Sequence, residues 1–365
     1  MPLLDQGQVI RDTYEVERFL GQGAFAEVYR VKHRFLGRQA MKVFKRAGIS
    51  LDEIHEMLGE AILLSRIGHP NIVRVFDANV FESPSGNCGY FTMENVPGGS
   101  LDKFWRSFGP SLIPVETTVD LIKQVCRGLS QAHQEKPPII HRDIKPQNIL
   151  VGYEPDGLRA RVSDFGLAKK VNPLTLLATA AGTLQFKPPE AFAQRKADSP
   201  AADVWAIGTT LYLLLTDRLP VEMPEGTTWT ARNLFDKPIT PPTQVNPDIS
   251  KDLEKVVMRS LEKSPEKRYP SARELLHELD AAPLHDPGPT PRKSLSSEAS
   301  KTVFGNASPM DGSQARTLVE KALEARRGGR LGEAADLMEE AFNKAPDLRE
   351  KYVHQVKLWR CGISM

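Results

Sequence analysis

The chain has 365 residues, of which 40% are hydrophobic, so it is long enough for two domains or for one large domain with an appendage. Its formal net charge of +2 argues against a nucleic-acid-binding protein driven by bulk positive charge. The three cysteines lie far apart without metal-ligand spacing, which is typical of a protein in the reducing cytoplasm. The first residues show no basic segment followed by an apolar one, and no apolar run is long enough to cross a bilayer. We therefore expect a cytoplasmic protein without a membrane segment.

A glycine-rich turn is predicted at residues 21–26, between strand-like segments at 14–20 and 27–31. Its sequence is Gly-Gln-Gly-Ala-Phe-Ala, and glycines allow backbone N–H groups to approach phosphate oxygens closely. A short strand at residues 39–44 then carries one lysine, Lys42, where an ammonium group would supply the countercharge to a phosphate. Each feature alone is weak, because most glycine-rich turns are simply tight turns and a strand lysine is usually solvated.

The spacing of apolar residues predicts a helix over residues 51–67. Glu60 lies off its apolar stripe, a position that suits either a solvated carboxylate or an ion-pair partner. Gly59 directly before it should weaken the helix by about 1 kcal/mol relative to alanine, so we expect this helix to be easily displaced. Two strands follow, at residues 73–76 and 90–93.

A polar loop at residues 141–148 carries the densest group of chemically useful side chains, and a helix that begins near Glu116 leads into it. Asp143 can accept a proton from an incoming hydroxyl group. Lys145 can neutralise a transferring phosphoryl group, and Asn148 can offer its carbonyl oxygen to a magnesium ion. A short strand is predicted directly after the loop.

An Asp-Phe-Gly tripeptide at residues 164–166 follows a predicted strand at 159–162. Its carboxylate suits magnesium, a hard ion that prefers oxygen ligands. The next segment ends in Gly-Thr-Leu-Gln-Phe-Lys-Pro-Pro-Glu at residues 182–190. Beyond it, a strongly apolar and therefore buried helix is predicted to open at Asp203.

In their order and spacing, these motifs together resemble the protein kinase family. The loop His-Arg-Asp-Ile-Lys-Pro-Gln-Asn at residues 141–148 matches the family pattern H-R-D-x-x-x-x-N in full, and its Ile-Lys-Pro-Gln portion resembles the serine/threonine-specific version. The resemblance covers residues 14–280. It implies an α+β, bilobal kinase fold with a small β-rich N-lobe at about 14–94 and a large α-helical C-lobe at about 97–280.

The resemblance also implies roles for single residues. Asp143, Lys145 and Lys42 would be catalytic, while Asn148 and Asp164 would hold Mg²⁺, with Mn²⁺ as an alternative ion. ATP would be the phosphoryl donor. The residues implied to surround it are Leu20, Gly21, Gln22, Gly23, Ala24, Phe25, Ala26, Glu27, Val28, Ala40, Lys42, Glu60, Met93, Glu94, Val96 and Leu150.

Three of these expectations are specific in geometry. Glu60 would form an ion pair with Lys42. The backbone groups of Glu94 and Val96 would pair with the adenine edge, and Met93 would stand as the gatekeeper at the back of the pocket.

The sequence departs from the family pattern in places that carry no catalytic atom. Ala26 replaces the third glycine of the loop, and Phe186 replaces a tyrosine near the end of the activation segment. We therefore expect a working site. By the same resemblance, Asp203 would brace the catalytic-loop backbone and Arg268 would pair with Glu190.

Residues 167–190 would form the activation segment, whose Thr183 would lie beside the catalytic loop. Thr175 and Thr179 are candidate regulatory phosphosites, and Arg142 is the group that would bind such a phosphate, since guanidinium pairs well with phosphoryl oxygens. The alternative is that both threonines are ordinary loop residues.

The composition changes after the kinase-like region. Residues 281–313 are rich in proline, glycine and serine, which predicts a flexible linker and a candidate region for autophosphorylation. Residues 315–361 resemble one degenerate tetratricopeptide repeat, with an unrelated alanine-rich helical hairpin as the alternative. Because one repeat cannot bury its own apolar face, we expect the tail to pack on the kinase domain, on a second copy or on a protein partner.

The sequence thus predicts an ATP-dependent serine/threonine protein kinase of bacterial type that acts on protein substrates and on itself. We expect neither a nucleic acid nor a membrane among its partners. The alternative is a pseudokinase scaffold that acts through the tail, but the phosphate-binding lysine and both aspartates that such proteins commonly lose are present. A small-molecule kinase is disfavoured by Lys145, Thr183 and the Pro-Pro-Glu segment.

Overall fold

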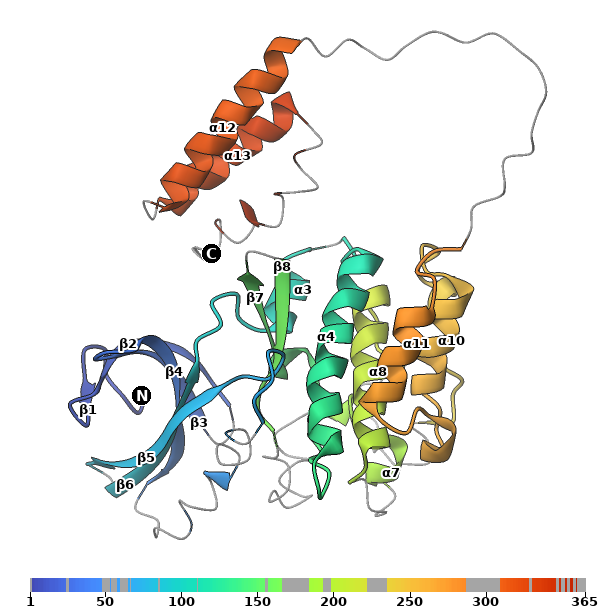
Figure 1. Cartoon of the computed structure of the whole chain (residues 1–365), viewed down its shortest axis with the longest axis horizontal. Coiled ribbons are helices and arrows are strands. Elements are labelled where there is room, and N and C mark those ends of the chain that lie inside the picture. The colour runs from blue at the N-terminus through green and yellow to red at the C-terminus, as the bar shows by residue number, and fades with distance from the viewer. Residues whose placement is uncertain are drawn as a thin grey trace. The chain divides into compact units, whose positions relative to one another are not determined.

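The computed structural model divides the chain into two compact units, Met1–Asp102 with Leu112–His285, and Lys103–Ser111 with Asp286–Met365. Figure 1 shows its helices and strands. No helix in the part of the chain that the structure describes combines the length and the apolar character needed to span a bilayer. The residues that the structure describes are 2–23, 26–47, 53, 58–59, 65, 67–84, 86–109, 111–154, 157–165, 184–192, 198–221, 235–286, 309–327, 330–345, 348, 352, 355–356 and 359.

The first part of unit 1 is a six-stranded antiparallel sheet with the strand order β1-β2-β3-β4-β6-β5 (Figure 1). The predicted strand pairs are present and their strands are longer than the sequence indicated, but the strand predicted at 73–76 begins at Val75 and continues to Ser83. The strands are β1 (Val9–Ile10), β2 (Tyr14–Gln22), β3 (Ala26–His33), β4 (Gly37–Ala47), β5 (Val75–Ser83) and β6 (Gly86–Glu94).

Both faces of the central strands are covered, which explains why their sequences do not alternate cleanly between polar and apolar residues. Tyr29, Met41 and Val43 belong to one buried cluster, whereas Ala40 and Phe44 of the same β4 belong to another. Lys42 on β4 lies between Met41 and Val43 in sequence, so its side chain points to the face of Ala40 and Phe44. Lys42 is therefore a buried lysine on the same face of the sheet as Ala40 and Phe44.

The rest of unit 1 is mainly helical. In Figure 1, α4, α8, α10 and α11 lie side by side, and contacts between their residues join α8 to each of the other three. A two-stranded hairpin, β7–β8, lies between α4 and α8 in the chain, and a 3-10 turn leads into it. The main elements of this part of unit 1 are α4 (Val115–Gln134), the 3-10 turn (Pro146–Asn148), β7 (Ile149–Glu154), β8 (Gly157–Val162), α7 (Pro189–Phe192), α8 (Pro200–Thr216), α10 (Lys251–Ser260) and α11 (Ala272–Ala281). The helix α3 (Leu101–Arg106) begins at the last two residues of the first segment of unit 1 and continues into unit 2.

The apolar helix α8 begins at Pro200, three residues before the predicted start at Asp203. The hydroxyl of Ser199 accepts the N–H of Ala202 and so caps the helix, and Pro200 occupies a first-turn position where no N–H is needed. Residues 201–216 are buried on all sides, which is why the helix shows little amphipathic pattern. The predicted buried helix is confirmed, and its start is corrected.

Two glycines allow elements of unit 1 to approach one another closely. A Cβ atom on Gly128 of α4 would lie 2.8 Å from the carbonyl oxygen of Asn71. One on Gly208 of α8 would lie 2.7 Å from Cβ of Ser260 on α10. Both separations are shorter than a carbon atom tolerates, so these positions require glycine for packing rather than for backbone freedom.

The tail contains two long helices, α12 (Pro309–Arg327) and α13 (Leu331–Lys344). They form a cluster of their own that includes four buried alanines, Met338 and Trp359. The predicted helical tail is therefore present. Because α12 begins at Pro309, the helical part starts four residues before the predicted end of the linker at residue 313.

Candidate functional site

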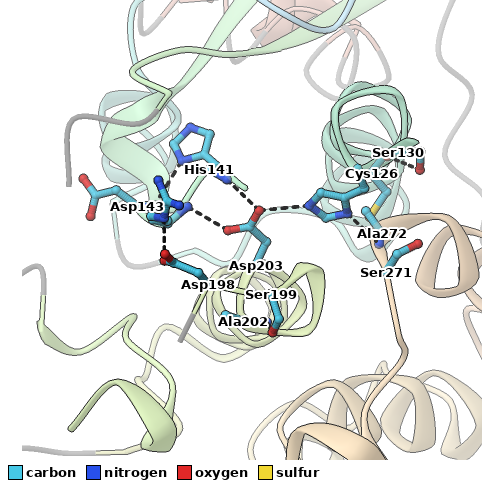
Figure 2. A network of polar contacts seen from close by, with 12 residues as sticks. Cys126, Ser130, His141, Asp143, Asp198, Ser199, Ala202, Asp203, Ser271 and Ala272 are labelled. Carbon is cyan, nitrogen blue, oxygen red and sulfur yellow. Dashed lines mark hydrogen bonds and ion pairs between the residues drawn. The ribbon is translucent and has the colours of Figure 1, made fainter. Parts of the chain in front are cut away.

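The polar loop at residues 141–148 is held by one buried carboxylate, that of Asp203 on α8 (Figure 2). Its Oδ2 accepts the backbone N–H of His141 and its Oδ1 that of Arg142, both at 2.8 Å. His133 Nε2 on α4 lies 2.9 Å from the same carboxylate. Burial raises the pKa of Asp203, but the hydrogen bond and charge of His133 and the contacts of His141 outweigh it, so the pKa lies below its usual range. The predicted bracing role of Asp203 is confirmed.

Asp143 is the centre of the loop's chemistry, and Figure 2 shows its carboxylate pointing away from Asp203. Lys145 Nζ lies 2.8 Å from Asp143 Oδ2, and Asn148 Nδ2 donates to the same oxygen at 2.9 Å. Asn148 Nδ2 also donates to the backbone carbonyl of Asp143 at 2.8 Å. The side chain keeps 21% of its surface exposed, so a hydroxyl group from solution can reach it. Lys145 and Asn148 therefore both contact the carboxylate of Asp143, and all three residues come from the one predicted motif.

Lys42 and Asp164 are brought together from the sheet and from the end of β8. Lys42 Nζ forms an ion pair with Asp164 Oδ1, and the lysine side chain is only 6% exposed. Lys42 Nζ also lies 5.5 Å from the centre of the Phe91 ring. Burial raises the pKa of Asp164, but the Lys42 ammonium outweighs it and holds the pKa below its usual range. Asp164 is therefore an anion positioned by a cation from the other lobe.

An apolar cluster lies on the same face of the sheet as Lys42. Ala40 of β4 is paired with Met93 of β6, and both belong to one buried cluster. Leu20, Val28 and Leu150 are partly buried and pack against it. Leu150 comes from β7, whereas the other four come from the six-stranded sheet, so both lobes contribute to the cluster. All five were predicted to surround ATP.

The segment that leads from the end of β6 to α3, called the hinge below, carries the backbone groups of Glu94 and Val96 that were predicted to pair with adenine. The N–H of Glu94 donates to the carbonyl of Arg74 at 2.8 Å, which leaves its carbonyl oxygen as the group that could meet a ligand. The carbonyl of Val96 accepts the N–H of Gly99 at 3.3 Å, which leaves the N–H of Val96. One acceptor and one donor of this kind suit the edge of an adenine ring. The Glu94 side chain is turned aside, where it pairs with Arg161 at 3.0 Å.

The glycine-rich turn closes tightly, because the N–H of Gly23 donates to the carbonyl of Ala26 at 2.8 Å. Gly21 and Gln22 end β2, and Val28 lies opposite Gly21 on β3. Ala24 and Phe25 lie outside the described residues.

Glu27, the remaining residue of this turn predicted to surround ATP, has its side chain engaged elsewhere. The carboxylate is buried, accepts the N–H of Leu3 at 2.8 Å and accepts the hydroxyl of Tyr29. Burial and the neighbouring Glu27 carboxylate raise the pKa of Tyr29 to about 12. Glu27 can therefore line the phosphate loop only through its backbone. The N-terminal segment that binds it was not predicted from the sequence.

The end of the activation segment is anchored by Arg268. Its Nη1 and Nη2 donate to Oε1 and Oε2 of Glu190, each at 2.7 Å, and its side chain has no exposed surface. The predicted pairing of these two residues is confirmed. Phe186, which replaces the family's tyrosine, is buried, as an aromatic side chain without a hydroxyl allows.

Several predicted residues lie outside the part of the chain that the structure describes. The ion pair between Glu60 and Lys42 remains a prediction for this reason. Arg142, the predicted phosphate-binding residue, is described, and its Nε donates to Asp198 Oδ1 at 2.6 Å. The other predicted residues outside the described ranges are Thr175, Thr179 and Thr183.

Three functional neighbours were missed in the sequence. His133 binds the bracing carboxylate, and Asp198 binds Arg142. Lys187 lies close to Asp143, at 3.5 Å between Nζ and Oδ1. The available signal for Lys187 was a lysine between two apolar residues, Phe186 and Pro188, at the end of the activation segment.

The described residues fit a magnesium nucleotide. Asp164 and Asn148 supply the hard oxygen donors that Mg²⁺ prefers. Lys42 supplies a cation near Asp164, and the apolar cluster and the hinge supply the apolar and backbone groups that suit a flat, hydrogen-bonding base. No single element provides all of these features.

Comparison with known proteins is consistent with this geometry. The family described as "Protein kinase domain" matches residues 14–279. The chain is 33% identical over 277 residues to a probable serine/threonine-protein kinase, CA_C1728, of Clostridium acetobutylicum, an alignment that covers 75% of this chain and 40% of that protein. It is 30% identical over 323 residues to the serine/threonine-protein kinase PknB of Mycobacterium tuberculosis, with 86% and 50% covered. The chain therefore spans half or less of the length of these two relatives.

A solved kinase-domain structure has a similar fold. The PknI kinase domain of Mycobacterium tuberculosis superposes on this chain with a TM-score of 0.58 and 25% sequence identity. The match covers 76% of this chain and 98% of that domain. The family match ends at residue 279, so it does not include α12 and α13.

Proposed function

The chain belongs to the protein kinase domain family, and on this basis we propose that it transfers the γ-phosphoryl group of ATP to serine and threonine hydroxyls of proteins. The observation that carries the proposal is the convergence of Lys145 and Asn148 on the carboxylate of Asp143. The serine/threonine preference is supported by the two relatives, which are named serine/threonine-protein kinases, and by the loop that contains Lys145. The substrates are protein segments that can place a hydroxyl group at Asp143.

Each side chain of the site has its own role in the proposed phosphoryl transfer. Asp143 orients the acceptor hydroxyl and takes its proton, and Lys145 stabilises the charge that passes to the transferred group. Lys42, on β4, binds the phosphate groups of ATP. Asp164 and Asn148 would hold Mg²⁺, which neutralises charge on the β- and γ-phosphate oxygens. The ion pair of Lys42 with Asp164 keeps both groups in place before the nucleotide binds.

We also propose that activation involves phosphate binding at Arg142. Its guanidinium already pairs with Asp198, whose side chain is 53% exposed, so an incoming phosphate on Thr175 or Thr179 would compete with a solvated carboxylate. Autophosphorylation is the simplest source of that phosphate.

The helical tail is proposed as a repeat-like module for a protein partner or for self-association.

The proposal is tested by separating nucleotide binding from transfer. Lys42→Met should weaken ATP binding and remove turnover while the chain remains folded at the assay temperature. Lys255→Met, on the exposed side of α10, is the matched control and should leave both unchanged. Phosphoamino-acid analysis of the labelled product should find phosphoserine or phosphothreonine.

If the chain is a pseudokinase scaffold, the opposite labelling result is expected. It would bind or ignore ATP without labelling any protein, and Lys42→Met would then change nothing in the labelling assay. Turnover that survives Lys42→Met would count against the phosphate-gripping role of this lysine.

A further inference from the structure

Lys187 lies two residues before the start of α7, and its side chain contacts the catalytic loop. Its Nζ donates to the backbone carbonyl of Arg142 at 2.6 Å and lies 3.5 Å from Asp143 Oδ1. The side chain is only 14% exposed. A lysine buried to this extent, with both contacts on consecutive residues of one loop, is fixed in position rather than solvated.

The two oxygens of the Asp143 carboxylate have different surroundings. Oδ2 takes two close donors, Lys145 Nζ at 2.8 Å and Asn148 Nδ2 at 2.9 Å. Oδ1 faces the Lys187 ammonium at the longer distance of 3.5 Å. An ionised carboxylate has about four acceptor positions, so Oδ1 keeps room for a further donor such as a hydroxyl group.

The second contact of Lys187 acts on the main chain. Arg142 has a φ of 69°, in the left-handed region that residues with a Cβ rarely adopt. Its carbonyl group begins the peptide bond that leads to Asp143. By holding this carbonyl, Lys187 restricts the direction in which the Asp143 side chain leaves the backbone.

We propose that Lys187 is a positioning residue for phosphoryl transfer, which holds Asp143 so that Oδ1 faces the hydroxyl group of the protein substrate. This inference rests on the proposed kinase function. The hydrogen bond and ion pair of Lys187 in the described part of the chain join it to Arg142 and Asp143, so its effect should fall on the acceptor side of the reaction. It also makes the end of the activation segment part of the acceptor site.

The charges around Lys187 predict a pH dependence of activity by which the proposal can be tested. Burial lowers the pKa of Lys187, and the like charge of Lys145 lowers it further, while Asp143 and Asp203 oppose the shift. The net result is a pKa below the usual range of lysine. The ammonium is therefore lost at a lower pH than that of a solvated lysine, and the orientation of Asp143 should weaken with it.

Lys187→Met and Lys187→Arg test the inference in steady-state assays with the full chain, MgATP and a serine-containing acceptor protein. Lys187→Met should lower kcat by about tenfold or more, since small displacements of reacting groups are costly, while KM for ATP changes little. Lys187→Arg should retain more activity. Its guanidinium stays charged, so the alkaline fall in activity should move to higher pH. Lys255→Met should match the parent chain.

Two results would overturn the inference. One is a Lys187→Met chain with the parent's kcat and alkaline profile. The other is a loss of activity in both variants that follows a lowered melting temperature, with no shift of the alkaline limb in Lys187→Arg, which would mark a merely structural lysine. An inactive parent chain would overturn the proposed function together with the inference, and so is distinguishable from both.

Discussion

Asp203 and His141 are joined by a hydrogen bond of 2.8 Å from the backbone N–H of His141 to the buried carboxylate, although 62 residues separate them in sequence. The bond attaches the catalytic loop to α8, whose residues 201–216 are all buried. The loop can therefore present Asp143 without depending on its own irregular backbone for rigidity.

Asp203→Ala should destabilise the chain strongly. The substitution leaves two loop N–H groups and the imidazole of His133 without their acceptor, and each buried unsatisfied group costs about 1–3 kcal/mol. We expect the free energy of unfolding to fall by about 3 kcal/mol or more, measured by urea denaturation. Asp252→Ala, at an exposed position on α10, should change it little. Equal stability of the two variants would refute the bracing role.

The same carboxylate predicts a pH dependence of stability. The pKa of Asp203 is lowered in the folded chain, so its contribution is present above the unfolded value of about 3.9 and is lost as the pH falls through the folded value. The stability gap between the parent and Asp203→Asn should therefore be largest near neutral pH and shrink below about pH 4. Urea midpoints measured from pH 7 to pH 3 check this. A gap that does not change with pH would contradict it.

Arg268 and Glu190 should show strong coupling. Because the Arg268 side chain has no exposed surface, Arg268→Met leaves the Glu190 carboxylate nearly buried without its partner and should cost about 3–5 kcal/mol. Adding Glu190→Leu removes that stranded charge, so the double variant should be less destabilised than the sum of the single variants. Unfolding of all four chains in urea measures the coupling. Additive effects would mean that the two residues do not stabilise each other.

Gly128→Ala should destabilise the contact between α4 and the segment at Asn71. The new Cβ would lie 2.8 Å from a backbone oxygen that cannot rotate away, and overpacking of this kind costs about 1–3 kcal/mol. Gly68→Ala is the control, because its Cβ would meet no atom within 4 Å. Thermal unfolding of both variants distinguishes them, and equal melting temperatures would contradict the packing argument.

The hairpins, the helix before the loop and the buried helix α8 follow from local patterns, and the sequence predicted them. The pairings of Arg268 with Glu190 and of Asp203 with the loop came from the family resemblance, because nothing local in the sequence indicates either partner. The start of α8 was missed although Ser199 and Pro200 carry a recognisable capping signal.

Other features had no local signal. β1 has only two residues, too few to show a strand pattern. The engagement of Glu27 with Leu3 depends on how the N-terminal segment folds over the sheet. Lys187 is recognisable as a neighbour of Asp143 only after the chain has brought together residues that are 44 positions apart in the numbering.

The most direct test of the central claim is the rate of phosphoryl transfer by Asp143→Asn. The purified chain and this variant are incubated with Mg²⁺, labelled ATP and an acceptor protein, and label on serine and threonine is counted. We predict transfer by the parent chain and a loss of at least about a hundredfold in the variant, with ATP binding retained. Equal labelling by both chains, or labelling by neither, would contradict the account.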